Sequence, residues 1–237
     1  MNEIRNFVSS LKRKMFSPSA KFKWGDFESF QPVSQNWGFD RGKPIDRYYI
    51  ENFLNENSNY IKGYCLELLN ANYTQQFGGN RVSKYDILDI DEQNQQATII
   101  ADLTVENCLP HNQYDCIILT QVLQHIFDVK KAIQNLYQAL KPGGYMLITV
   151  PFVMKYHQEP MDCWRFTVQS IEMLLSESTG EKPTKVCSFG NLLTSIAFLK
   201  ALGTNDIPKK MLDYDDLHYP VSICAILKKN SEIEKHN

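Results

Sequence analysis

Short apolar runs recur along the chain and predict β-strands. They lie at residues 64–69, 81–88, 97–103, 114–120 and 145–151, with two more in TKVCSFG and YPVSICAIL near the C-terminal end. The runs YDCIILT and YMLITVP are apolar nearly throughout, which is typical of strands that are covered on both faces.

Segments with helical periodicity lie between these strands. One helix is predicted directly after Pro44, and VKKAIQNLYQALK (129–141) is clearly amphipathic. The second helix is expected to stop at KPGG, where Pro142 cannot continue it and the two glycines permit a tight reversal. Further helices are predicted at 168–177 and in NLLTSIAFLKALG. This alternation predicts an α/β fold, in which helices cover both faces of a parallel sheet.

Composition places the chain among globular proteins without a strong charge bias. The formal net charge is −2, and 43% of the residues are hydrophobic. A balanced charge provides no field that attracts nucleic acid, and no segment approaches the roughly 18 apolar residues of a membrane span. The six cysteines form no CxxC pair or metal-like cluster, and the start of the chain contains no signal peptide. We therefore expect a reduced, cytoplasmic protein without a bound metal.

The N-terminal segment has a composition of its own. Apolar residues at helical spacing (Ile4, Phe7, Val8, Leu11, Met15) are surrounded by cations (Arg5, Lys12, Arg13, Lys14). Such a helix can lie on an anionic membrane, but more often it packs on its own domain or on a second subunit. We expect a basic helix and lid segment at 1–43, a main domain at 44–228 and a frayed polar tail at 229–237. A homodimer is left open, and stable membrane insertion is not expected.

Polar residues follow the ends of the predicted strands, where ligands bind in an open parallel sheet. A carboxylate after the second strand can accept hydrogen bonds from ribose hydroxyls, and an aspartate after the third can accept one from an adenine amino group. In chain order the polar groups are Glu67, the acids Asp86, Asp89 and Asp91, then Asp102, then Thr120 and Gln121. The ordered set favours a nucleoside-containing ligand.

Several motifs resemble those of one enzyme family. The segment YDCIILTQVLQHIFDVKKAIQNLYQALKPGGYMLITVP (114–151) resembles the fourth-to-fifth-strand region of class I S-adenosylmethionine-dependent methyltransferases, and ATIIADLT resembles their third-strand segment. The motifs RGKPIDRYYIENFL (41–54) and WRFT (164–167) are similar to those of a bacterial subgroup found alongside glycosyltransferases and secondary-metabolite pathways. The resemblance implies a Rossmann-like three-layer sandwich of about seven mostly parallel strands, the last one antiparallel. It also implies S-adenosyl-L-methionine as cofactor.

The same resemblance implies roles for individual residues. Glu67 and Leu68 begin the cofactor loop, and Asp86 or Asp89 reaches the ribose, with Asp86 favoured because it directly follows the strand-like VSKY. The remaining cofactor residues are Asp102 and Leu103 at the adenine, and Thr120 and Gln121 beside the methionine portion.

The loop departs from the family pattern E-x-G-x-G-x-G. Leu69 stands at the first glycine position, although glycine favours the left-handed backbone needed there. Asn tolerates this geometry next best, so Asn70 and Asn72 are expected to supply part of it. Because Leu69 does not fit, a non-catalytic scaffold that has lost the cofactor is the main alternative.

The candidate catalytic residues are His125 and His157, since an imidazole is a suitable base for an acceptor hydroxyl. His125 can instead cap the next helix or order the loop, and His157 can be a solvated loop residue. The candidate acceptor-binding residues are Trp164 and Arg165, as an aromatic wall and an anion clamp, together with Arg41, Arg47 and Tyr48. The alternatives are that Trp164 fills the core, that Arg165 pairs with Asp162, and that the residues near Asp46 only stabilise the start of a helix.

These observations favour O-methylation of a small molecule, at a sugar hydroxyl or at a carboxylate of a metabolite or small peptide. A nicotinamide-dependent oxidoreductase is disfavoured because no GxGxxG follows the first strand. Nucleic-acid methylation is disfavoured because the chain has no basic stripe beyond its N-terminus and no Asn-Pro-Pro-Tyr-like motif.

Overall fold

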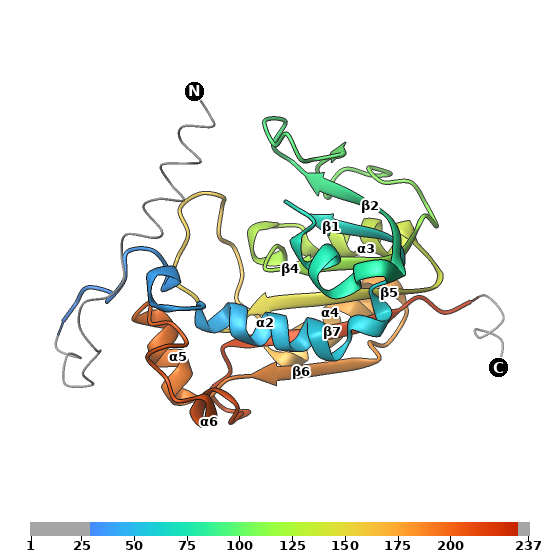
Figure 1. The fold of residues 1–237 in the computed structure, drawn as a ribbon. Coiled ribbons are helices and arrows are strands. Elements are labelled where there is room, and N and C mark those ends of the chain that lie inside the picture. Colours follow the sequence, from blue (N-terminus) through green and yellow to red (C-terminus); the bar gives the residue numbers. More distant parts are fainter. Residues whose placement is uncertain (1–28, 232–237) are drawn as a thin grey trace. The chain divides into compact units, whose positions relative to one another are not determined.

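The computed structural model describes residues 29–231, so the predicted basic helix and most of the predicted tail lie outside the described residues (Figure 1). The chain divides into two compact units. The larger one, called the sheet unit, contains Ile50–Phe152, Tyr156–Ser188 and the chain from Ser222 onward. The smaller one, called the helical unit, contains the described chain up to Tyr49, Val153–Lys155 and Phe189–Val221.

A seven-stranded sheet has the order β3-β2-β1-β4-β5-β7-β6. Neighbouring strands from β3 to β5 are parallel, and β7 runs antiparallel to β5. The strands are β1 Gly63–Leu68, β2 Val82–Asp89, β3 Ile99–Ile100, β4 Tyr114–Thr120, β5 Leu140–Pro151, β6 Lys185–Phe189 and β7 Ser222–Lys228. The predicted Rossmann-like, mostly parallel sheet with an antiparallel last strand is confirmed.

Four of the α-helices lie where the periodicity predicts them, and the short α6 was not predicted. The α-helices are α2 Ile45–Glu56, α3 Val129–Ala139, α4 Val168–Thr179, α5 Leu192–Leu199 and α6 Lys209–Leu212. Single turns are η2 Phe39–Arg41, η3 Ser58–Tyr60, η4 Thr74–Gly78, η5 Gly79–Arg81 and η6 Leu123–His125. Within the described residues, none of the helices is long and apolar enough to cross a membrane.

Both faces of the sheet are apolar and covered. On one face, Leu66, Ile117 and Ile148 are fully buried in a core that also contains residues of α3 and α4, such as Ile133 and Ile171. The two helices pack side by side against this face (Figure 1). The alternate positions Cys65, Cys116, Ile118 and Leu147 point to the other face and are equally buried. Burial on both faces explains why these strands are apolar runs instead of alternating ones.

The junction between α3 and β5 differs from the prediction. The helix ends at Ala139, and the KPGG segment is the start of β5, not a tight reversal. Gly144 lies so close to the neighbouring strand that a Cβ there would meet the carbonyl oxygen of Tyr114 at 3.0 Å. Gly144 is therefore needed for the close approach of the two strands.

The helical unit has its own core and one buried ion pair. Ile45, Tyr49 and Leu202 belong to this core. The Arg41 guanidinium donates to both carboxylate oxygens of Asp206, at 2.8 and 2.6 Å, and both side chains are buried.

Candidate active site

The carboxyl ends of the parallel strands meet at one edge of the sheet unit. The sheet order places β2 and β3 on one side of β1, and β4 and β5 on the other. The chain thus reverses its direction of winding between β1 and β4. Ligands of open α/β sheets bind outside such a switch point, so the residues that follow these strands form the candidate site.

The turn after β1 is built on Glu67. Its buried carboxylate accepts hydrogen bonds from the backbone N–H groups of Tyr73, at 3.1 Å, and Thr74, at 2.6 Å. Burial raises the pKa of this carboxyl group above its usual value, while the N–H donors oppose the rise. Glu67 therefore organises the loop from inside, and Leu68 packs against the core beside it.

Leu69 adopts the backbone conformation that glycine takes in the family pattern. Its φ is +71°, in the left-handed region, and its side chain is 54% exposed. A left-handed conformation costs an L-residue about 1–2 kcal/mol. The expectation that Asn70 and Asn72 supply this geometry is wrong, because neither has a positive φ. Instead, Asn70 accepts a hydrogen bond from the N–H of Asn72.

Two hydrogen bonds hold Leu69 in place. Its N–H donates to the carbonyl of Leu88 at 2.9 Å, and its carbonyl accepts from the side-chain amide of Asn94 at 2.8 Å. The same amide donates to the carboxylate of Asp89 at 2.6 Å. Sequence reasoning missed Asn94, since an Asn in a polar loop carries no distinctive pattern.

Asp86, the residue favoured for the ribose contact, does not end its strand, because β2 continues to Asp89. Three residues of strand separate Asp86 from that end, roughly 10 Å. The Asp86 carboxylate accepts hydrogen bonds from the hydroxyls of Tyr64, at 2.5 Å, and Tyr114, at 2.9 Å. Burial is the largest cause of the raised pKa of both tyrosines, and their bonds to Asp86 add to it. Asp89, by contrast, lies at the strand end, with Asp91 exposed after it.

The residues after β3 and β4 retain unused polar groups. Asp102 accepts two hydrogen bonds from Thr104 through Oδ1, and the next residue, Leu103, has its side chain in the core. Thr120 ends β4, and Gln121 follows in a left-handed conformation with φ of +54°. Within residues 29–231, neither polar atom of the buried Gln121 amide has a hydrogen-bond partner. Buried polar atoms without a partner are costly, and at this strand end they are available to a polar ligand.

The two candidate histidines lie together. The ring centroids of His125 and His157 are 5.5 Å apart, and one ring is edge-on to the other. Nδ1 of His125 is 2.9 Å from the carbonyl oxygen of Met161. The N–H of His157 donates to Asp162 at 2.9 Å. The pairing that brings the two histidines together could not be read from their separation in the sequence.

Gln124 connects the turn after β4 with this loop, and sequence reasoning missed it. Its carbonyl accepts from the N–H groups of Cys163, at 2.7 Å, and Trp164, at 3.2 Å. Its side-chain nitrogen donates to the carbonyl of Gln121 and lies 3.2 Å from Nε2 of His125. The only sequence signal is its place between the candidate residues Gln121 and His125.

Trp164 and Arg165 differ in what they can offer a ligand. The indole N–H of Trp164 donates to the carbonyl of Ile126 at 3.0 Å, and the ring remains partly exposed. Arg165 pairs with Asp162 through both terminal nitrogens, at 2.5 and 2.8 Å. This pairing is the largest cause of the lowered pKa of Asp162, about 2.

The other predicted acceptor residues belong to the helical unit. Arg41 is bound to Asp206, as described above, and the hydroxyl of Tyr48 donates to Asp213. Arg47, between them in the chain, is half-buried in the first turns of α2. Arg41 and Tyr48 therefore each have a partner within the helical unit.

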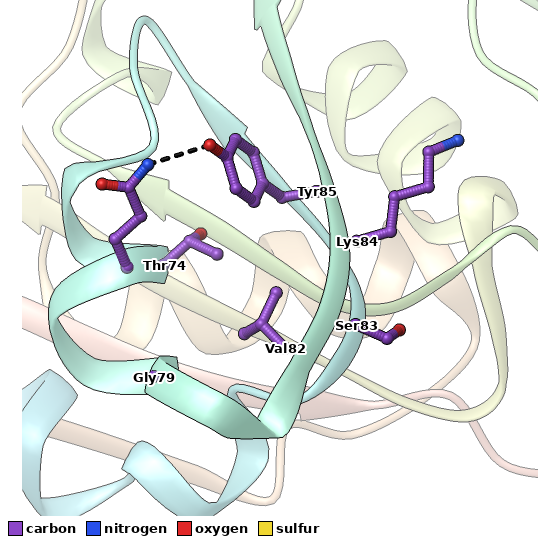
Figure 2. Close-up of a pocket in the computed structure, with 7 residues that line it drawn as sticks. Thr74, Gly79, Val82, Ser83, Lys84 and Tyr85 are labelled. Carbon is purple, nitrogen blue, oxygen red and sulfur yellow. Dashed lines mark hydrogen bonds between the residues drawn. The ribbon is translucent and has the colours of Figure 1, made fainter.

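A separate hollow lies beside the first half of β2. It encloses about 330 Å³ and is lined by Thr74, Gln75, Gly79 and residues 82–85. Figure 2 draws the residues that line it, with a hydrogen bond to the hydroxyl of Tyr85; the donor is the side-chain amide of Gln75, at 2.9 Å. The hollow contains none of the residues at the strand ends, so it is distinct from the candidate site.

Comparison with known proteins identifies the family. A family model described as a methyltransferase domain matches residues 35–179, more than half of the chain. The chain is 27% identical over 133 residues to a probable polyketide synthase 8/35 of Dictyostelium discoideum. The match covers 49% of this chain but only 5% of that protein. The chain thus spans a small part of this curated relative.

Solved structures share the fold. An S-adenosylmethionine-dependent methyltransferase from Archaeoglobus fulgidus has a TM-score of 0.54 at 15% identity, over 77% of this chain and 94% of the other. A second such methyltransferase, from Mesorhizobium loti, has a TM-score of 0.52 at 15% identity, over 78% and 97% of the two chains.

The residues at the strand ends fit the cofactor of this family. Within the described residues, the Gln121 amide is buried without a partner, and both bonds to Asp102 use the same oxygen, which leaves the other available. Leu69 supplies the left-handed turn despite its side chain. The chain therefore belongs to the methyltransferase-domain family, as a class I member that uses S-adenosylmethionine.

Proposed function

We propose that this chain transfers a methyl group from S-adenosylmethionine to a hydroxyl oxygen of a small molecule, with His125 as the general base. The observation that carries the proposal is the contact between Nδ1 of His125 and the carbonyl of Met161. Because a carbonyl only accepts, Nδ1 carries the proton of the neutral ring, and Nε2 carries the lone pair.

The cofactor residues are assigned along the strand ends. Asp89 is assigned to the ribose hydroxyls because it ends β2, whereas Asp86 lies three residues before that end. Asp102 and Leu103 are assigned to the adenine edge, and Thr120 and Gln121 to the methionine portion. When bound, S-adenosylmethionine supplies an electrophilic methyl group on a sulfonium.

The base acts on the acceptor. The hydroxyl proton passes to Nε2 of His125 as the oxygen takes up the methyl group. The side-chain nitrogen of Gln124 lies 3.2 Å from Nε2, so the acceptor hydroxyl takes the place of this contact. General base catalysis of this kind contributes typically 10²–10⁴-fold to a rate. His157, against the His125 ring, is proposed to position it.

A neutral hydroxyl is favoured over a carboxylate as acceptor. A carboxylate is best bound by a bidentate arginine, but Arg165 is engaged by Asp162 and Arg41 by Asp206. A carboxylate is also ionised at neutral pH and needs no base. The similarity to a probable polyketide synthase supports a small-molecule acceptor. The non-catalytic scaffold is disfavoured, because the turn after β1 retains its left-handed residue.

Two measurements test the proposal. Calorimetric titration with S-adenosylhomocysteine is expected to show binding, and no binding at millimolar ligand would overturn it. Turnover is then followed as S-adenosylhomocysteine release with a panel of neutral alcohols and phenols. His125→Ala is expected to reduce turnover roughly 100-fold or more without loss of S-adenosylhomocysteine binding, and His157→Ala is expected to reduce it less. Full turnover of His125→Ala would exclude His125 as the base.

A further inference from the structure

Phe127 and Trp164 form an exposed aromatic surface, called the aromatic shelf. Their rings are stacked at 28°, with centroids 5.8 Å apart. Phe127 is 71% exposed and Trp164 is 39% exposed. Covering adjacent exposed aromatic rings is favourable, because stacking alone leaves their outer faces in solvent.

Hydrogen bonds to backbone carbonyls hold Trp164 in place in the shelf. The indole N–H of Trp164 donates to the carbonyl of Ile126, and its backbone N–H donates to the carbonyl of Gln124. Since the polar atom of the indole is already bonded, the ring has only its apolar face to offer a ligand. A ring fixed in advance loses little conformational entropy on binding.

The shelf adjoins the proposed base in the chain and through hydrogen bonds. Phe127 follows His125 by two residues, and Met161, whose carbonyl accepts from His125, precedes Trp164 by three. The cation next to Trp164 is paired, since Arg165 is bound to Asp162. The surroundings therefore favour a flat, uncharged group over an anion.

We propose that the aromatic shelf binds an aromatic ring of the acceptor, so that the methylated hydroxyl is phenolic. This inference rests on the proposed function and names its substrate class. Phenols have a pKa near 10, far below that of aliphatic alcohols, so a phenolic proton is the easier one to pass to an imidazole base. In the step, the phenolic O–H bond breaks toward Nε2, the O–CH₃ bond forms, and the methyl–sulfur bond breaks with its electrons left on sulfur.

The test compares 2-naphthol with its saturated counterpart decahydro-2-naphthol. Both have a hydroxyl on fused six-membered rings, but only the first is aromatic. Binding is measured by saturation-transfer NMR on the full chain with S-adenosylhomocysteine present. We expect 2-naphthol to bind more tightly than its saturated counterpart. Phe127→Leu and Trp164→Leu are expected to weaken 2-naphthol binding by roughly two- to tenfold.

Control variants keep the outcome clear. Tyr219→Leu replaces a comparably exposed aromatic residue outside the shelf, 46% exposed, and is expected to leave binding unchanged. Trp164→Phe keeps an aromatic face and is expected to lose less than Trp164→Leu. Circular dichroism confirms that each variant folds.

Each outcome has one meaning. Equal binding of the two naphthol compounds, or unchanged binding in both leucine variants, would overturn the aromatic shelf while leaving hydroxyl methylation intact. Loss of self-association in the leucine variants, with naphthol binding unchanged, would assign the shelf to a second copy of the chain and also overturn the proposal. Failure of S-adenosylhomocysteine itself to bind would overturn the proposed function instead.

Discussion

The side-chain amide of Asn94 donates a 2.8 Å hydrogen bond to the carbonyl oxygen of Leu69. The two residues lie in loops that follow different strands. The bond holds a leucine in a left-handed conformation that a glycine would adopt without strain. Because the amide also reaches Asp89, one side chain joins the turn after β1 to the end of β2.

Asn94→Ala is expected to weaken both cofactor binding and stability. The change removes two donated hydrogen bonds, one of them to a carboxylate, and a loss of about 1–3 kcal/mol in the free energy of unfolding follows. The dissociation constant for S-adenosylhomocysteine is expected to rise about tenfold. Gln96→Ala, in the same loop, is the control. Identical calorimetric titrations for Asn94→Ala and the unmodified chain would contradict the prediction.

Leu69→Gly is expected to stabilise the protein by about 1 kcal/mol, because the left-handed conformation costs glycine nothing while the lost side chain is half exposed. For a chain of this size the midpoint of thermal unfolding rises by about 2–4 °C. Leu69→Ala keeps a Cβ and therefore the strain, so it should show no such gain. A lower melting temperature for the glycine variant than for the alanine variant would show that Leu69 is not strained.

Asp162→Asn is expected to change stability in a pH-dependent way. The pairing with Arg165 lowers the pKa of Asp162 to about 2 in the folded chain, below the roughly 3.9 of an unfolded chain. A lowered pKa means that the carboxylate stabilises the fold fully above about pH 4 and loses this contribution as the pH falls toward 2. Urea unfolding of both proteins should give a constant difference between pH 5 and 7, of about 1 kcal/mol.

Below pH 4 that difference should shrink, because the unmodified chain then protonates Asp162 as well. A difference that stays constant down to pH 2.5 would mean that the ion pair contributes nothing to the pH dependence. His125→Ala, measured in parallel, controls for changes in the charge of the neighbouring imidazole.

Lys229→Met is expected to destabilise the protein by about 1–2 kcal/mol. The ammonium group donates to the carbonyls of Leu140, at 2.8 Å, and Tyr137, at 3.1 Å, and to the side chain of Asn112, at 2.9 Å. It thus satisfies carbonyls at the C-terminal end of α3, where a cation is favoured. Lys182→Met, at an exposed position, is the control. Equal urea midpoints for the two variants would show that Lys229 does not stabilise the C-terminal end of α3.

Lys229 and Asn230, the first residues of the tail that we expected to be frayed, are held by hydrogen bonds. Lys229 holds α3, and Asn230 donates to Glu181 at 2.7 Å. The sequence shows only polar residues there, and the partners that tie them down come from distant parts of the chain.

Patterns within short stretches determined the elements of the fold. The apolar run at 114–120 is β4 at the same bounds, and the amphipathic period over 129–141 is α3 apart from its last two residues. Such patterns suffice because the local backbone period sets which side chains share one face of a helix or strand. The order of polar residues after the strands likewise located the candidate site.

The contacts of individual side chains were decided only by the tertiary structure. Asp86 is bonded to tyrosines of β1 and β4, and Arg41 to Asp206, 165 residues away. Leu69 takes a glycine's conformation because Leu88 and Asn94 hold its backbone. Local propensity disfavours the left-handed conformation of Leu69, and it says nothing about the partners of Asp86 and Arg41. Long-range hydrogen bonds in a buried environment decide all three.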